Sequence, residues 1–204
     1  MNADAPGWLF SVLAFALSMS GTPGPNNAMV AASGATFGFT RTVPHLLGVA
    51  VGFPAMLLVV ALGAGDVMRA APPLHEILRW VGAAYLLWLA FKIATARPSA
   101  AGTRAVRARP LTFLQAALFQ WVNPKAWIIA LGAIATYTTS SNITVQAVVL
   151  AAIFMAVTVP TLAFWTMTGV GAARVLRTGR GLRAFNLAMA ALLVASLVPL
   201  LREG

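Results

Sequence analysis

The sequence predicts an all-α membrane protein that crosses the bilayer several times, and three observations support this prediction. Hydrophobic residues make up 60% of the 204 residues and charged residues only 9%, too little charge to cover a soluble domain. Apolar residues gather in six runs of about 20 residues, the helix length that crosses a bilayer core. The arginines lie mainly between those runs, as is typical of loops that set membrane topology. The six expected helices cover residues 8–33, 43–65, 77–96, 111–137, 143–168 and 184–201.

Composition also excludes several kinds of partner. The formal net charge is +10, but the basic residues form no stripe on an amphipathic helix, so we expect no nucleic acid. They suit instead the anionic lipids of a cytoplasmic membrane face. The chain has no cysteine, which excludes thiolate metal ligands, and we expect neither metal nor cofactor. Residues 1–7 carry Asp4 and no basic residue, unlike the start of a signal peptide, so we expect the first apolar run to be retained.

The first expected helix is interrupted in its middle by the sequence Gly-Thr-Pro-Gly-Pro-Asn-Asn at residues 21–27. Proline removes backbone donors, and glycine loosens the backbone. Irregular backbone at membrane depth is tolerated only where it is buried in protein or lines a cavity. This interruption is therefore predicted to lie at the working centre of the protein.

The second to sixth expected helices complete two similar halves. The second expected helix contains Pro54, a predicted hinge, and the third expected helix follows after a short connection. Residues 97–110 lack apolar periodicity and read as a connector. The fourth helix is interrupted at Asn123-Pro124-Lys125, and the fifth contains Pro160, a second predicted hinge. We predict one transmembrane domain, 1–204, built as a 3+3 inverted repeat with broken first and fourth helices: repeat 1 at 1–96, a cytoplasmic connector at 97–110 and repeat 2 at 111–204.

The basic residues predict that both termini lie outside. With this orientation, ten basic residues face the cytoplasm and three face outward, which agrees with the positive-inside rule. The cytoplasmic ten are Arg41, Lys92, Arg97, Arg104, Arg107, Arg109, Arg174, Arg177, Arg180 and Arg183, and the outer three are Arg69, Arg79 and Arg202.

Both interruptions have the sequence of a helix that restarts. Asn123 is a good N-cap and Pro124 suits the first helical turn, and Gly24-Pro25 permits the same start. Each restart brings free N–H groups and the positive end of a helix dipole into the interior, which favours a bound carboxylate. The predicted substrate-binding residues are Thr22, Pro23, Gly24, Pro25, Asn26, Asn27, Asn123, Pro124 and Lys125.

Plainer explanations exist for these residues. Each asparagine either orients an amino acid's zwitterion or caps its own broken helix, and the prolines alone are explained by packing kinks. Lys125 is the charged residue placed deepest in an expected helix, at a cost of roughly 2.5–3.5 kcal/mol, so it should have a partner. Its partner is either a substrate carboxylate or the orphan carbonyl groups at the C-terminal end of a half-helix.

Two histidines require an interpretation. His45, near the inner end of the second expected helix, is either a group that titrates near neutral pH or, more simply, an interface anchor with satisfied hydrogen bonds. Asp66 and His75 are the one acid–base pair that would suit an integral membrane enzyme acting at the lipid interface, the alternative to a transporter.

Several segments resemble the LysE/RhtB family of bacterial amino-acid exporters. They are Thr-Pro-Gly-Pro-Asn-Asn at 22–27, Ser-Gly-Ala-Thr-Phe-Gly at 33–38, Leu-Leu-Gly at 46–48, Gly-Ala-Ala-Tyr-Leu at 82–86 and Asn-Pro-Lys at 123–125. The resemblance implies a six-span protein of the bacterial inner membrane, not an enzyme, that exports amino acids or related metabolites by exchange with protons.

The charged residues of the expected helices indicate which class of substrate the protein transports. No carboxylate lies in the core of an expected helix, which favours a neutral substrate over lysine or arginine. The same absence leaves Lys125 and His45 as titratable candidates for proton exchange. A metal-cation exporter would need Cys, His or acidic clusters in the helices, and the expected helices contain none. A membrane scaffold protein that transports no solute remains an alternative. The sequence also leaves open whether the chain forms a homo-oligomer.

Overall fold

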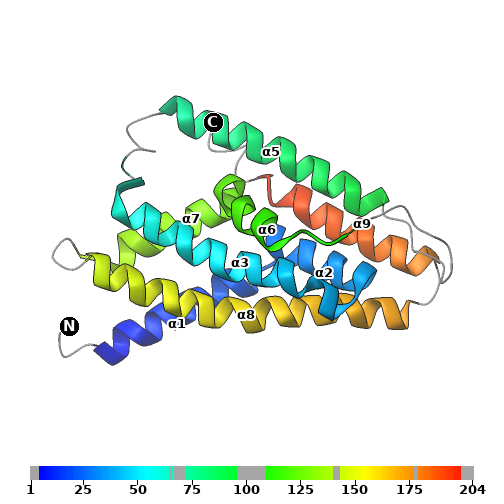
Figure 1. The fold of residues 1–204 in the computed structure, drawn as a ribbon, viewed down its shortest axis with the longest axis horizontal. Coiled ribbons are helices and arrows are strands. Elements are labelled where there is room, and N and C mark those ends of the chain that lie inside the picture. The colour runs from blue at the N-terminus through cyan, green and yellow to red at the C-terminus, as the bar shows by residue number, and fades with distance from the viewer. Residues whose placement is uncertain are drawn as a thin grey trace.

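The computed structural model describes residues 5–64, 66, 72–95, 109–139, 143–176 and 179–198, and among these it contains helices but no strand. The all-α prediction is confirmed. The helices lie along one long axis and form an elongated bundle (Figure 1). Their bounds are α1 Ala5–Gly21, α2 Pro25–Phe37, α3 Phe39–Val59, the π-helical η1 Val60–Ala64, α5 Pro72–Thr95, α6 Phe113–Phe119, the 3-10 turn η2 Gln120–Val122, α7 Pro124–Tyr137, α8 Ile143–Val175 and α9 Gly179–Ala195.

Several helices extend beyond the apolar runs that predicted them. α3 and α9 begin at Phe39 and Gly179, where residues 43 and 184 were expected, and α8 continues to Val175 beyond the expected 168. The prediction followed hydrophobicity, whereas helical hydrogen bonding continues into the polar ends of a membrane helix. The connector predicted at 97–110 lies outside the described residues except for its last two.

The outer surface of the described bundle is apolar. Two helical stretches, Phe39–Gly63 and Ile143–Val175, are long and apolar enough to cross a membrane by length and composition, and shorter apolar helices accompany them. Phe10, Phe91 and Phe164 are 74%, 65% and 65% exposed, on three different helices. Large apolar side chains turned outward on many helices suit contact with lipid.

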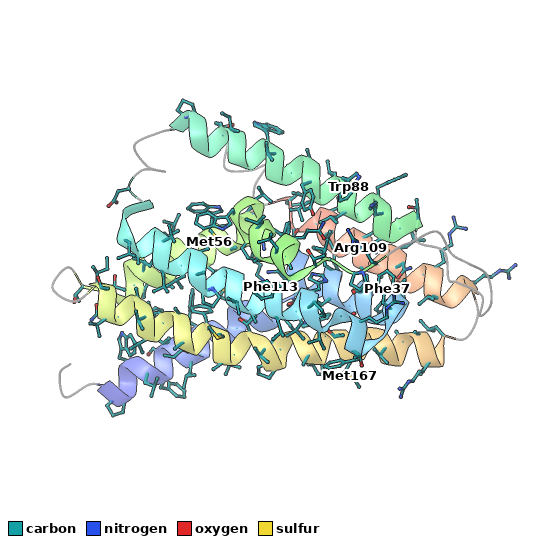
Figure 2. All side chains as sticks on the ribbon, viewed as in Figure 1. Phe37, Met56, Trp88, Arg109, Phe113 and Met167 are labelled. Carbon is teal, nitrogen blue, oxygen red and sulfur yellow. The ribbon has the colours of Figure 1, made fainter. Side chains whose placement is uncertain are left out.

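The described interior contains two large hydrophobic clusters, one in each half of the bundle, and a smaller one of Val30, Leu46, Val49, Ala116 and Leu162. In the half that contains the start of α1, a hydrophobic cluster joins α1, α3, α7 and α8, with Met56 and Phe154 at its centre. In the other half, a second cluster joins α2, α5, α6 and α9 around Leu86 and Phe119. Met56 lies in the first half, whereas Phe37 lies in the second (Figure 2).

Glycine contacts bring α2 and α8 very close in the second half. A Cβ added to Gly34 would overlap the backbone oxygen of Thr166, and a Cβ added to Gly169 would overlap that of Ala31. Two helices approach this closely only where one of them has no side chain. The described backbone is therefore tightly closed at this contact.

Basic side chains collect at one end of the bundle, which we call the basic end. The start of α3, the end of α5, the end of α8 and the start of α9 all lie there (Figure 1). The exposed basic residues on these segments are Arg41, Lys92, Arg174, Arg180 and Arg183. The charge asymmetry inferred from the sequence is thus also present in three dimensions.

Candidate solute-binding site

The structure interrupts the first and fourth apolar runs. α1 ends at Gly21 and α2 restarts at Pro25, with Gly24 as an extended N-cap at φ −171°. In the fourth run, η2 ends at Val122, Asn123 takes an extended conformation (φ −90°, ψ 108°), and α7 restarts at Pro124. Proline occupies the first turn of each restarted helix, where its missing N–H costs nothing. Both helix restarts predicted from the sequence are present.

Hydrogen bonds join the two interruptions directly. The Lys125 ammonium donates to the Thr22 carbonyl oxygen at 2.8 Å and to the Thr22 hydroxyl at 2.9 Å. Asn26 and Gln120 exchange side-chain amide hydrogen bonds, at 2.9 Å from Asn26 Nδ2 to Gln120 Oε1 and 3.2 Å in the reverse direction. Residues about 100 positions apart in the sequence therefore form one polar centre.

Lys125 is held by the end of the opposite half-helix. Thr22 immediately follows α1, so its carbonyl group is one of the groups that a helix end leaves without an intrahelical partner. Gly24 makes room for the lysine, because a Cβ added there would lie 2.9 Å from Lys125 Cδ and 3.0 Å from Nζ. An ammonium has three N–H donors, and the two contacts with Thr22 leave one for another acceptor.

Asn27 and Asn123 differ in their hydrogen bonding. Asn27 donates through Nδ2 to the carbonyl oxygens of Ser20 at 2.8 Å and Thr22 at 2.9 Å, so it closes the end of α1 and does not cap its own helix. Asn123 makes no side-chain capping bond, and its buried Oδ1 has no hydrogen-bond partner among the described residues. Buried acceptors of this kind usually bind water, an ion or a ligand.

A small cavity lies where the interruptions meet. Its volume is about 50 Å³, room for a few water molecules. Six of the predicted substrate-binding residues line it, whereas Thr22, Pro23, Pro124 and the predicted hinges Pro54 and Pro160 do not. The lining consists of Met19, Ser20, Gly24, Pro25, Asn26, Asn27, Val49, Phe53, Asn123, Lys125, Ala126, Ile129, Phe154, Thr158 and Leu162.

Sequence reasoning missed two polar residues of this centre. Gln120 is fully buried and pairs with Asn26, and Thr158 of α8 lines the cavity. An uncharged amide within an apolar run was the available signal for Gln120, because buried polar groups in membrane helices need partners. Thr158 had no such signal, since isolated threonines are common in apolar helices.

The cavity lining contains one charged side chain, Lys125, and no carboxylate. In the described part of the chain, no group of three or more His, Cys, Asp or Glu residues is placed to hold a metal ion. The arrangement can therefore bind an anionic group beside Lys125 and a hydrogen-bond donor beside Asn123 Oδ1.

The interpretation of His45 as a satisfied interface anchor is wrong. His45 is 2% exposed, and neither ring nitrogen has a hydrogen-bond partner among the described residues. The helix begins at Phe39, so His45 lies more than one turn inside α3. Of the acid–base pair considered for an enzyme, Asp66 is exposed, and the side chain of His75 lies outside the described part of the structure.

An apolar helical bundle with a polar cavity at two interrupted helices defines a membrane protein that handles a small solute. The family model of the LysE type translocator matches residues 17–204, and the chain belongs to this family. The family consists of transporters, so the alternative of a membrane enzyme is wrong.

Curated relatives carry a more specific name. The chain is similar to the "Cysteine/O-acetylserine efflux protein" of Salmonella typhi, 37% identical over 116 residues, or 57% of this chain and 58% of that protein. It is also similar to the protein of the same name from Escherichia coli K12, 32% identical over 132 residues, or 65% of this chain and 66% of that protein. The matched stretch thus spans less than two thirds of these relatives. No solved structure matches the chain.

Proposed function

We propose that this chain exports small neutral amino acids from the bacterial cytoplasm across the inner membrane, in exchange for protons. The main support for the proposal is that one cavity contains both a cationic hydrogen-bond donor and an unpaired hydrogen-bond acceptor. Lys125 offers a cationic donor, and Asn123 Oδ1 offers a buried acceptor without a partner in the described structure. An amino-acid zwitterion presents the complementary groups, a carboxylate and an ammonium.

In the proposed binding mode, the carboxylate lies beside Lys125 and the first N–H groups of α2 and α7. Both helices restart at the cavity, so their positive ends favour an anion there. The ammonium donates to Asn123 Oδ1. Asn26, held by Gln120, and Thr158 contact the remaining polar atoms of the solute.

The proposed substrate has an uncharged side chain. The lining offers no carboxylate that would neutralise the side chain of lysine or arginine, and burying an unpaired cation is costly. Cysteine and O-acetylserine, named for the relatives, are small amino acids without a charged side chain near neutral pH. They are the first candidates for this chain too.

Transport would proceed by alternating access between two inverted repeats of three spans each, with Pro54 and Pro160 as hinges. The first span comprises α1 and α2, and the fourth comprises α6, η2 and α7. We place the basic end in the cytoplasm, near anionic lipids, and both termini outside. The exposed apolar helix faces leave room for a homo-oligomer.

Uptake of labelled amino acids into inverted membrane vesicles tests this proposal. We expect the vesicles to accumulate cysteine, O-acetylserine or another small neutral amino acid, and not lysine. Asn123→Ala and Lys125→Ala should lose this transport at equal expression.

Two matched variants serve as controls for these substitutions. Asn186→Ala also removes a buried amide whose oxygen has no partner among the described residues, but it lies away from the cavity. Lys92→Ala removes the other lysine of the chain, which lies 4.3 Å from the Trp88 ring centroid. Wild-type transport by both Asn123→Ala and Lys125→Ala would refute the site, and uptake of lysine alone would refute the substrate class.

A further inference from the structure

His45 is a buried polar group for which the solute-binding site has no use. It does not line the cavity, yet both imidazole nitrogens lack hydrogen-bond partners in the described structure. A neutral imidazole carries one donor and one acceptor, and leaving either unpaired in a protein interior is costly. Such an unpaired buried group in a native protein calls for an explanation, such as a functional role or a bound water or ion.

The position of His45 connects the cavity with the basic end. Val49 and Phe53 line the cavity one and two turns further along α3, so His45 lies about 6 Å from the level of Val49 along the helix axis. In the other direction, Thr42 is one turn away and lies 2.9 Å from the Ser33 hydroxyl of α2. His45 is thus placed between the cavity and a buried polar pair.

Few other groups in this region change charge. The chain has four carboxylates, Asp4, Asp66, Glu76 and Glu203, and none belongs to α2, α3, α6, α7 or α8. The titratable side chains of the helices packed against α3 are Lys125 and Tyr137 of α7 and Arg174 of α8, and α3 itself adds Arg41. Lys125 already donates to Thr22, and Arg41 is exposed above the Phe37 ring.

We propose that His45 is the proton-binding group of the transport cycle. This inference rests on the proposed function and assigns a residue to the proton exchange in it. Histidine is the side chain that gains and loses a proton most readily near neutral pH. An imidazolium one turn from the cavity disfavours a second positive group there, such as the solute's ammonium, because charges interact strongly in a poorly hydrated interior. Proton and solute therefore bind alternately, as antiport requires.

The buried position also fits alternating access. The α2–α8 contact through Gly34 and Gly169 and the contact of Gly48 with the Phe113 backbone close the described structure on the side of the basic end. Separation of these helices would let water reach the imidazole from the basic end, while the cluster around Met56 and Phe154 keeps the other side dry. A proton bound at His45 would thus be exposed to one compartment at a time.

His45→Asn separates protonation from hydrogen bonding, because the amide keeps a donor and an acceptor but does not bind a proton near neutral pH. The purified full chain is placed in liposomes, and a radiolabelled amino acid that the wild type transports, cysteine in the first instance, is followed in two assays. One measures accumulation driven by an acidic interior, and the other measures exchange with unlabelled solute at equal pH. His75→Asn is the matched control, since His75 is the other histidine of the chain.

For one proton per solute, a gradient of one pH unit should drive roughly tenfold accumulation by the wild type and by His75→Asn. We expect His45→Asn to lose this accumulation while it keeps solute exchange within about twofold of wild type. Full accumulation by His45→Asn overturns the assignment and leaves the proposed transport intact. Loss of both accumulation and exchange in a variant with wild-type thermal stability also overturns it, because His45 is then needed for transport itself. A wild type that exchanges solute but ignores the pH gradient refutes proton exchange and the role of His45 together.

Discussion

Gly24→Ala tests whether the placement of Lys125 determines solute binding. The new Cβ would lie 2.9 Å from Lys125 Cδ and 3.0 Å from Nζ, closer than side-chain carbons normally approach. The obstructing atoms belong to the flexible end of a lysine, so the chain should still fold while the ammonium moves away from Thr22. It would then lose hydrogen bonds of 2.8 Å and 2.9 Å.

The size of the effect follows from the strength of such bonds. A hydrogen bond that involves a charged group contributes about 1.5–3 kcal/mol, so loss of the correct ammonium position should lower transport efficiency by about 10- to 150-fold. The assay is the concentration dependence of initial uptake in vesicles. The change should appear mainly as a higher KM, since in the proposed binding mode the lysine binds the solute's carboxylate.

Gly21→Ala is the matched control for this prediction. It makes the same change three residues earlier, where an added Cβ would meet nothing within 4 Å, and it should transport like the wild type. An unchanged KM in Gly24→Ala, or an equal loss in Gly21→Ala, would refute the reasoning that links Gly24 to Lys125.

Two further predictions concern other contacts. Gln120→Leu leaves the half-buried Asn26 amide without its fully buried partner and should destabilise the protein by about 1–3 kcal/mol, seen as a lower melting temperature in detergent. The exposed Gln115→Leu should cost at most a fraction of this, through its capping bonds to Thr112. Equal melting temperatures would contradict the importance of the pair. Gly169→Ala should separate α2 from α8 and so speed maleimide labelling of a cysteine introduced at Ser33 of this cysteine-free chain. Gly171→Ala is the control, because a Cβ added at Gly171 meets nothing within 4 Å. Equal labelling rates in the two variants would show that the contact does not close the basic end.

Much of the fold could be predicted from residue type and spacing. Apolar runs located the helices, and the Pro25 and Pro124 restarts follow from local backbone rules, because proline is tolerated best in the first turn of a helix. The ends of α3 and α8 could not be found in this way, since polar residues near a membrane interface are compatible with either helix or loop.

Pairing within the site was harder to predict. The sequence indicated that Lys125 needs a partner, but the choice between a solute and Thr22 depends on how α1 meets α7, which is a tertiary contact. In the same way, the exchange of amide bonds between Asn26 and Gln120 depends on two helices that are distant in sequence. The burial of His45 without hydrogen-bond partners likewise depends on the helices that pack around α3.

The decisive experiment is a structure determined with a bound amino acid. We expect the solute in the cavity between the two interrupted helices, with its carboxylate at Lys125 Nζ and its ammonium at Asn123 Oδ1. A solute bound elsewhere, with Asn123 and Lys125 out of contact with it, would refute the proposed binding site.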